Sequence, residues 1–262
     1  AIGMTAVTDD IVYLWRRPVL LAKSIFAMYM VMPAVAVLMA YVLDLPERTE
    51  LALVILAICA GAPLLPKKLI KFGGDPAYIF SLIVNTSLLA IVTVPASLHL
   101  LASIISLDTL TVTPVHVAGV IFKTFLLPLG IGMLLRWVAP ALAERIGEPL
   151  LKIASIVMGI CAIVALAAGF HLVFEVGLPS VLAFAAFTIA AILIGHFFGG
   201  PAPSDRTSLA IACASRHIGL ALLIAANARD QHALELVVAY LLASAVVSIP
   251  YVLWIRIRRK RE

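Results

Sequence analysis

The chain has 262 residues, carries a net charge of +5, and is 63% apolar but only 13% charged, where soluble domains average roughly 25% charged residues. A soluble domain of this size could not bury that much apolar surface, so these values exclude an ordinary soluble enzyme, a disordered chain and a disulfide-stapled secreted domain. The long, nearly continuous apolar runs predict an all-α polytopic membrane protein, because the strands of an outer-membrane barrel would be shorter and would alternate.

The first two predicted elements are a short helical remnant and a full membrane span. Residues 1–14 are apolar only as far as Val7, lack a basic segment and are too short for a signal peptide. We interpret them as the end of a helix that begins before Ala1. The uncharged run that follows predicts a span over 18–43, bent at Pro33.

The next element, residues 49–75, is predicted to be an interrupted helix. Gly61, Pro63 and Pro66 lie within six residues, and each proline removes a backbone donor from the helical hydrogen-bond ladder. Non-helical backbone at membrane depth is tolerated only where it is buried in protein or lines a watery cavity. We therefore expect a true break here, with a simple proline kink as the alternative.

The remaining elements alternate between apolar runs and polar connections. A loop is predicted over 101–114, and residues 257–262 form a basic tail. Together with the two spans already described, the apolar runs predict eight spans. The remaining six are 76–100, 115–138, 151–174, 178–198, an interrupted helix at 206–230, and 232–256.

Lysine and arginine divide unevenly between the two ends of these spans. If the basic C-terminus is cytoplasmic, fifteen basic residues lie at cytoplasmic ends and only Arg48 and Arg229 lie at the opposite ends. Cytoplasmic loops of membrane proteins carry an excess of Lys and Arg. The distribution therefore predicts a bacterial inner-membrane or plasma-membrane protein with a cytoplasmic C-terminus.

Two stretches of the sequence share one plan: a plain helix, an interrupted helix and a plain helix. The ends of their first helices, at 43 and 198, and of their interrupted helices, at 75 and 230, lie 155 residues apart. Two further spans precede the second stretch, so residues 115–256 form a five-helix unit and residues 1–100 are the remnant of a similar one. Units with an odd number of helices lie inverted in the membrane, as in many secondary transporters. We predict two inverted five-helix repeats with crossing interrupted helices; the alternative is spacing common to helical membrane proteins.

The second interruption, residues 212–219, contains the most informative side chain. Arg216 lies ten residues from Arg206 and thirteen from Arg229, which places it near the bilayer centre. An arginine there costs at least about 2.5–3.5 kcal/mol on insertion scales. We interpret Arg216 as a functional residue, with a structural ion pair or a water-filled crevice as the alternatives.

We expect the two interruptions to meet and to form a binding site for an anion. Partial positive charge from half-helix N-termini and full charge from basic side chains would both favour an anion there, although the lysines could instead snorkel to the interface. Pro66 and Arg216 should then lie within about one helix diameter, ~10 Å. The candidate substrate-binding and translocation residues are Arg216, His217, Lys67, Lys68, Ser215 and Asn85, and the helix breaks are at Gly61, Pro63, Pro66 and Gly219.

Three motifs resemble the bile acid:sodium symporter family. Cys59-Ala-Gly-Ala-Pro-Leu-Leu-Pro66, followed after nine residues by Gly74-Asp75, stands where that family has Cys-Pro-Gly-Gly-Thr-Ala-Ser-Asn and Gly-Asp. Ala212-Cys-Ala-Ser-Arg-His-Ile-Gly-Leu-Ala221 stands where it has Glu-Val-Gly-Met-Gln-Asn-Ser-Gly-Leu-Ala, and Arg206-Thr207 matches its upstream Arg-Thr. The resemblance implies ten helices in two inverted five-helix repeats, with the first helix missing from this chain.

The resemblance does not extend to the sodium ligands of the family. A hard cation needs oxygen donors, and this chain has hydrocarbon or cationic side chains at the matching positions. They are Leu65, Pro66, Ile79, Ile83, Ala212 and Arg216. We therefore expect no metal site and transport without the usual sodium sites.

These observations predict a secondary transporter that moves a small organic anion across the lipid bilayer. No cofactor, nucleic-acid partner or enzymatic activity is expected, and a homo-oligomer is left open. A non-coupled channel or uniporter is one alternative, and coupling through protonation of His217 is another. An intramembrane enzyme is the least favoured, because Phe72-Gly-Gly-Asp75 misses a Gly-x-Gly-Asp motif and no His-Glu-x-x-His occurs.

Overall fold

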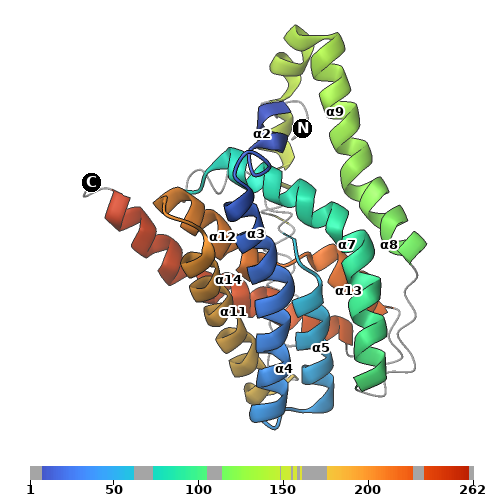
Figure 1. Ribbon diagram of the computed structural model, residues 1–262, viewed down its shortest axis with the longest axis vertical. Helices are drawn as coiled ribbons and strands as arrows, with labels where there is room; N and C mark the ends of the chain where they lie inside the picture. Colours follow the sequence, from blue (N-terminus) through green and yellow to red (C-terminus); the bar gives the residue numbers. More distant parts are fainter. Residues whose placement is uncertain are drawn as a thin grey trace.

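The computed structural model describes residues 8–61, 73–104, 114–147, 149–154, 156–157, 160, 176–226 and 233–259. Within these ranges every regular element is a helix, as predicted. Figure 1 shows most of the helices packed side by side in a bundle, with α8 (Pro114–Ile121) and α9 (Leu127–Val138) standing at one flank.

One of the long helical rods contains a local widening of the helix. It consists of α3 (Pro18–Phe26), the π-helical turn η1 (Ala27–Val31) and α4 (Met32–Val42). The bend predicted at Pro33 takes the form of this π turn, because a proline ring clashes with the carbonyl four residues earlier and a wider turn makes room for it. A second π turn, η2 (Phe122–Leu126), precedes Pro128 in the same way.

The described helices are those of an integral multi-pass membrane protein. The second predicted interrupted helix is divided into α12 and α13, and in the first the described helix ends at Ile58, before residues 62–72, which lie outside the described residues. The predicted span 115–138 contains η2. Most of the predicted span 151–174 also lies outside the described residues. Among the described residues, four helices are long and apolar enough to cross a membrane: Pro18–Val42, Pro76–Leu100, Leu178–Phe198 and Glu235–Arg258.

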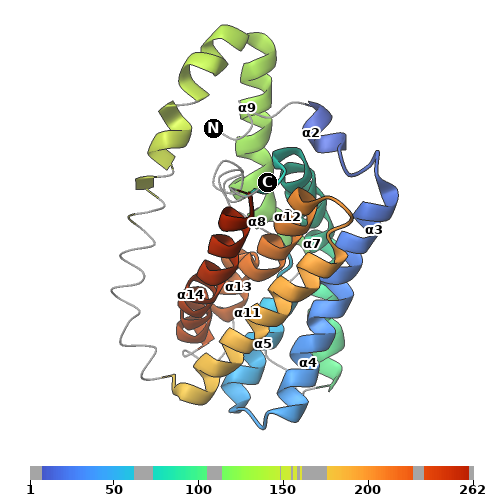
Figure 2. The same cartoon turned by 90° about the vertical axis from the view of Figure 1, so that its left-hand side faces the viewer.

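Two glycines bring a pair of helices into very close contact. α11 (Leu178–Phe198) has the predicted bounds, and α12 (Pro203–Ser215) returns alongside it (Figure 2). A Cβ atom on Gly195 would collide with the backbone of Ala210, and one on Gly199 would collide with the backbone of Arg206. Small residues four apart allow this approach of helix backbones in membranes. We call this contact the glycine seam.

The N-terminal segment folds against the helix that follows the first interruption. α2 (Thr8–Val12) ends earlier than the predicted remnant 1–14 and lies against α7 (Pro76–Ile104), which runs four residues past its predicted end. The hydroxyl of Ser81 donates to the carbonyl of Ile11 at 2.7 Å and accepts from the backbone N–H of Leu14 at 3.2 Å. These bonds fix the segment that carries Tyr13 and Arg17.

Candidate functional site

The two interrupted helices meet at their breaks. α5 (Glu47–Ile58) ends at Cys59, and α12 is separated from α13 (Ile218–Ala226) by Arg216 and His217. The backbone N–H of His217 donates a hydrogen bond of 2.9 Å to the carbonyl oxygen of Cys59. Each break therefore satisfies a backbone group that the other leaves without a helical partner.

Glycine is required where the first break approaches the second. Gly61 has φ +139°, a backbone conformation that side chains rarely permit, and a Cβ atom there would lie 3.2 Å from Cδ2 of the His217 ring. Both the conformation and the contact distance disfavour any larger residue. The predicted break residues Pro63 and Pro66, and the candidate residues Lys67 and Lys68, lie outside the described residues.

Arg216 is fully buried at the end of α12. Its side chain has 0% exposure, and its three guanidinium nitrogens have no hydrogen-bond partner among the described residues. Its backbone has φ +42°, a left-handed value that costs on the order of 1–3 kcal/mol in a residue other than glycine. A buried cation is strongly unfavourable unless it is paired, and among the described residues the guanidinium has no hydrogen-bonded anion.

Aromatic side chains surround the guanidinium. Cζ of Arg216 lies 5.5 Å from the ring centroid of Phe187, a distance at which the face of the ring attracts a cation. The hydroxyl of Tyr240 donates to the carbonyl of Ala214 at 2.6 Å, two residues before Arg216. The Tyr240 ring also contacts Phe184 and Phe187, with centroids 5.9 and 6.2 Å apart. Tyr240 thus anchors the last turn of α12 from outside that helix.

His217 has a structural role in the second break. Its ring Nδ1 accepts a hydrogen bond from the backbone N–H of Leu220 at 3.2 Å, and its carbonyl accepts from Leu220 and Ala221 at 3.0 Å each. The side chain therefore caps the N-terminus of α13, whose first turn contains the predicted break residue Gly219. An Nδ1 that accepts a hydrogen bond carries no proton.

Two other predicted site residues form hydrogen bonds within their own helices. The hydroxyl of Ser215 donates to the carbonyl of Ile211 at 2.7 Å. The amide of Asn85 donates to the carbonyl of Ser81 at 2.7 Å, on the side of α7 that holds the N-terminal segment. The Ser215 hydroxyl is therefore bonded within α12, although Ser215 directly precedes Arg216. The Asn85 amide is bonded within α7, on the face that contacts the N-terminal segment.

Of the positions that match the family's sodium ligands, the structure describes Arg216 and three buried hydrocarbon side chains. Ile79, Ile83 and Ala212 are buried, with exposures of 0%, 5% and 0%. In the described part of the chain, no three His, Cys, Asp or Glu side chains are close enough to hold a metal ion.

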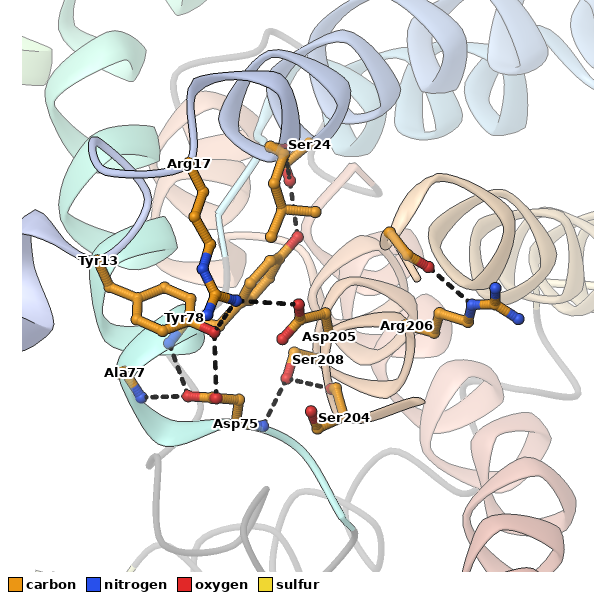
Figure 3. Close-up of polar contacts among 12 residues, drawn as sticks. Tyr13, Arg17, Ser24, Asp75, Ala77, Tyr78, Ser204, Asp205, Arg206 and Ser208 are labelled. Carbon is orange, nitrogen blue, oxygen red and sulfur yellow. Dashed lines mark hydrogen bonds and ion pairs between the residues drawn. The ribbon is translucent and has the colours of Figure 1, made fainter. Parts of the chain in front are cut away.

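A second polar site lies at the opposite end of α12, and sequence reasoning did not identify it. We call it the N-terminal polar cluster (Figure 3); it consists of Tyr13, Arg17, Asp75, Asp205 and Ser208. One guanidinium nitrogen of Arg17 lies 3.6 Å from Oδ2 of Asp205 and donates to the hydroxyl of Tyr13. That hydroxyl donates in turn to Oδ2 of Asp75 at 3.3 Å.

Asp75 links the N-terminus of α7 to α12. Its Oδ1 accepts from the backbone N–H groups of Ala77 and Tyr78 at 2.8 and 3.1 Å, which is the arrangement of a helix cap. Its own backbone N–H donates to the hydroxyl of Ser208 at 2.9 Å. An aspartate directly before a proline and an apolar run is the sequence signal that could have revealed this cap.

The cluster also bears on the alternative of a structural ion pair for Arg216, for which Asp75 and Asp205 are two candidate partners. Eleven residues separate Asp205 from Arg216, which is about 16 Å along the axis of α12, and both Asp75 and Asp205 are engaged at the far end. A structural ion pair between Arg216 and either aspartate is therefore wrong.

Comparison with known proteins gives one match. The model of the Sodium Bile acid symporter family matches residues 1–175, two thirds of the chain. The matched region contains the first break, whereas Arg216 lies beyond it. No curated protein matches the chain.

Proposed function

The chain belongs to the sodium bile acid symporter family, and we propose that it is a secondary transporter that binds a small organic anion at Arg216, between the two helix breaks. The family consists of membrane transporters, which implies a lipid bilayer and a small-molecule substrate. The observation that carries the proposal is the buried guanidinium of Arg216, whose nitrogens lack partners among the described residues.

The chemistry of the side chain favours a carboxylate or a related oxyanion. A guanidinium remains charged at any accessible pH and presents a planar set of donors that matches a carboxylate in bidentate geometry. The N-terminus of α13, which begins two residues later, adds partial positive charge. Lys67 and Lys68, which follow the first break in the sequence, are proposed to contribute at the same site.

We further propose that transport proceeds without sodium. In the family that this chain resembles, sodium is held partly by a glutamate, and Ala212 stands at that position. Arg216 is a permanent internal cation one helical turn later, so it replaces a bound cation near the substrate.

The arrangement of the breaks supports two inverted repeats and a cytoplasmic C-terminus. α5 and α12 have similar lengths, 12 and 13 residues, and each leads directly into a break. Their starts lie close to the 155-residue offset between the two halves of the sequence. The charge distribution places the start of α12 and the end of α14 (Ala233–Arg259) at the cytoplasmic surface.

The test combines binding and uptake in the purified protein. Thermal shifts are measured against a panel of organic anions, including the sulfonate taurocholate and simple carboxylates, in sodium and in choline buffers. Uptake of the best ligand into proteoliposomes is then compared for wild type and Arg216→Gln, with the exposed Arg256→Gln as the matched control. Equal wild-type activity in both buffers and loss only in Arg216→Gln support the proposal. Strict sodium dependence contradicts transport without sodium, and full activity of Arg216→Gln contradicts the assigned site.

A further inference from the structure

Asp205 is a buried carboxylate with an incomplete set of partners. It lies in the first turn of α12, and only 2% of its surface is exposed. Its Oδ1 has no hydrogen-bond partner among the described residues, and its Oδ2 has only the 3.6 Å contact with Arg17. An ionised carboxylate at such a depth normally accepts several hydrogen bonds.

The counter-charge of Asp205 is the guanidinium of Arg17, which also bonds Tyr13 and is partly exposed to solvent. The Arg17 side chain is 52% exposed, its Cζ lies 4.4 Å from the centroid of the Tyr13 ring, and it donates to the Tyr13 hydroxyl. Solvent weakens an ion pair of this kind. Arg206, on the same helix as Asp205, turns away and donates to the carbonyl of Gly200 at 2.7 Å.

Two charged neighbours act on Asp205 in opposite directions, since Asp75 favours a proton on it and Arg17 opposes one. The neighbours that interact with its charge are Asp75 directly before α7, Tyr78 of α7, and Tyr13 and Arg17 from the N-terminal segment. Burial raises the pKa of the Asp205 carboxyl above its ordinary value, the negative charge of Asp75 raises it further, and Arg17 lowers it in part.

Asp205 lies where the N-terminal segment, α7 and α12 meet. Through Arg17 it holds the start of α12 to the N-terminal segment, while Ser208, one turn later, holds α12 to Asp75 at the start of α7. α12 then continues to Arg216 at the break. A change of charge at Asp205 therefore acts directly on the helix that carries the anion site.

We propose that Asp205 binds and releases one proton in each transport cycle, and that its neutral form frees α12 from Arg17. The proton adds to a carboxylate oxygen of Asp205, which removes one negative charge, and Arg17 keeps only its contacts with Tyr13 and solvent. The inference rests on the proposed transport of an anion at Arg216, and it identifies the proton as the ion that accompanies that anion.

The proton site is tested without any substrate. Infrared difference spectra of the purified protein between about pH 8 and about pH 5 should show the carbonyl stretch of a protonated carboxylic acid. The band should be absent from Asp205→Asn and present in Asp44→Asn, because Asp44 is an exposed aspartate that serves as the matched control. In Arg17→Gln, which leaves Asp205 in place, the band should appear at a higher pH. An unchanged band in Asp205→Asn overturns the proposal.

Coupling is tested by uptake of radiolabelled taurocholate into sodium-free proteoliposomes. An imposed inward proton gradient should raise wild-type and Asp44→Asn uptake several-fold and leave Asp205→Asn uptake unchanged. Wild-type uptake that ignores the gradient overturns the coupling while the anion transport of the proposed function stands. If neither taurocholate nor any anion of the panel is taken up, the proposed function fails and the coupling fails with it, and the infrared band still decides whether Asp205 binds a proton.

Discussion

The backbone N–H of His217 donates a 2.9 Å hydrogen bond to the carbonyl of Cys59 and thereby joins the ends of α5 and α12. A helix that stops inside a membrane leaves backbone groups that water cannot reach. Each break supplies the hydrogen-bond partner that a backbone group of the other break needs, so a change in one break affects both. This mutual dependence makes the substitutions around the junction informative.

Substitution of Gly61 by alanine should destabilise the junction. Alanine does not tolerate φ +139°, and its Cβ would press on the His217 ring at 3.2 Å, so we expect a loss of about 1–3 kcal/mol in the free energy of unfolding. Thermal unfolding in detergent measures the effect. The matched control is Gly119→Ala in α8, where a Cβ would meet nothing within 4 Å and alanine should be neutral or stabilising. Equal effects at the two positions would contradict the close approach.

Substitution of Arg216 by methionine should separate stability from function. Arg216 is a buried charge whose guanidinium nitrogens have no hydrogen-bond partner among the described residues, and its replacement by an apolar side chain removes a desolvation penalty of several kcal/mol. The ligand-free variant should therefore unfold at the same temperature as wild type or higher. Its stabilisation by organic anions should disappear. Thermal unfolding with and without the anion panel provides both values. A marked loss of stability in the ligand-free variant would show that Arg216 has a permanent structural partner.

Removal of the Tyr240 hydroxyl should weaken the last turn of α12. Tyr240→Phe leaves the buried carbonyl of Ala214 without its 2.6 Å donor, and an unsatisfied buried acceptor costs about 1–3 kcal/mol. Tyr41→Phe is the matched control, because Tyr41 is 88% exposed and should tolerate the same chemical change. The prediction fails if the two variants unfold at the same temperature.

The stability of the protein should depend on pH through Asp205. Because burial and Asp75 raise the pKa of this carboxyl in the folded state, the folded protein binds the proton more tightly than the unfolded chain does. The contribution of this proton to the free energy of unfolding is fully present below the pKa of about 4 that Asp205 has in the unfolded chain. It is lost as the pH rises through the higher pKa of the folded state. Unfolding temperatures measured from below about pH 4 upward should therefore fall with rising pH in wild type and in Asp44→Asn. A decline of the same size in Asp205→Asn would assign it to other groups.

Local signals in the sequence predicted the broken helices better than they predicted contacts between distant segments. The bounds of α11, and a break at 212–219 containing Arg216, follow from apolar runs and from the cost of an intramembrane charge. The two π turns were missed, because a proline in an apolar run indicates a disturbance without indicating its form.

The partners of the charged residues required the tertiary structure. The sequence does not show that Arg17 lies beside Asp205 rather than in a solvated loop, because the pairing depends on how the segment after α2 folds over the start of α12. Phe187 and Tyr240 look like ordinary residues of apolar spans, and only the packing of α11 and α14 on α12 brings them to the break. Asn85 shows the converse, since a polar residue in a span was expected at the site and is tied to Ser81 of its own helix.

The glycine seam also determines how this protein can change shape. With the backbones of Gly195 and Gly199 in direct contact with Ala210 and Arg206, α11 and α12 cannot slide or rotate past each other without steric collision. They form one rigid unit, and within the described residues the helix of α12 is interrupted at Arg216–His217. A rearrangement that exposes the proposed anion site to the two sides of the membrane in turn would therefore bend at this interruption, which contains the arginine proposed to bind the substrate.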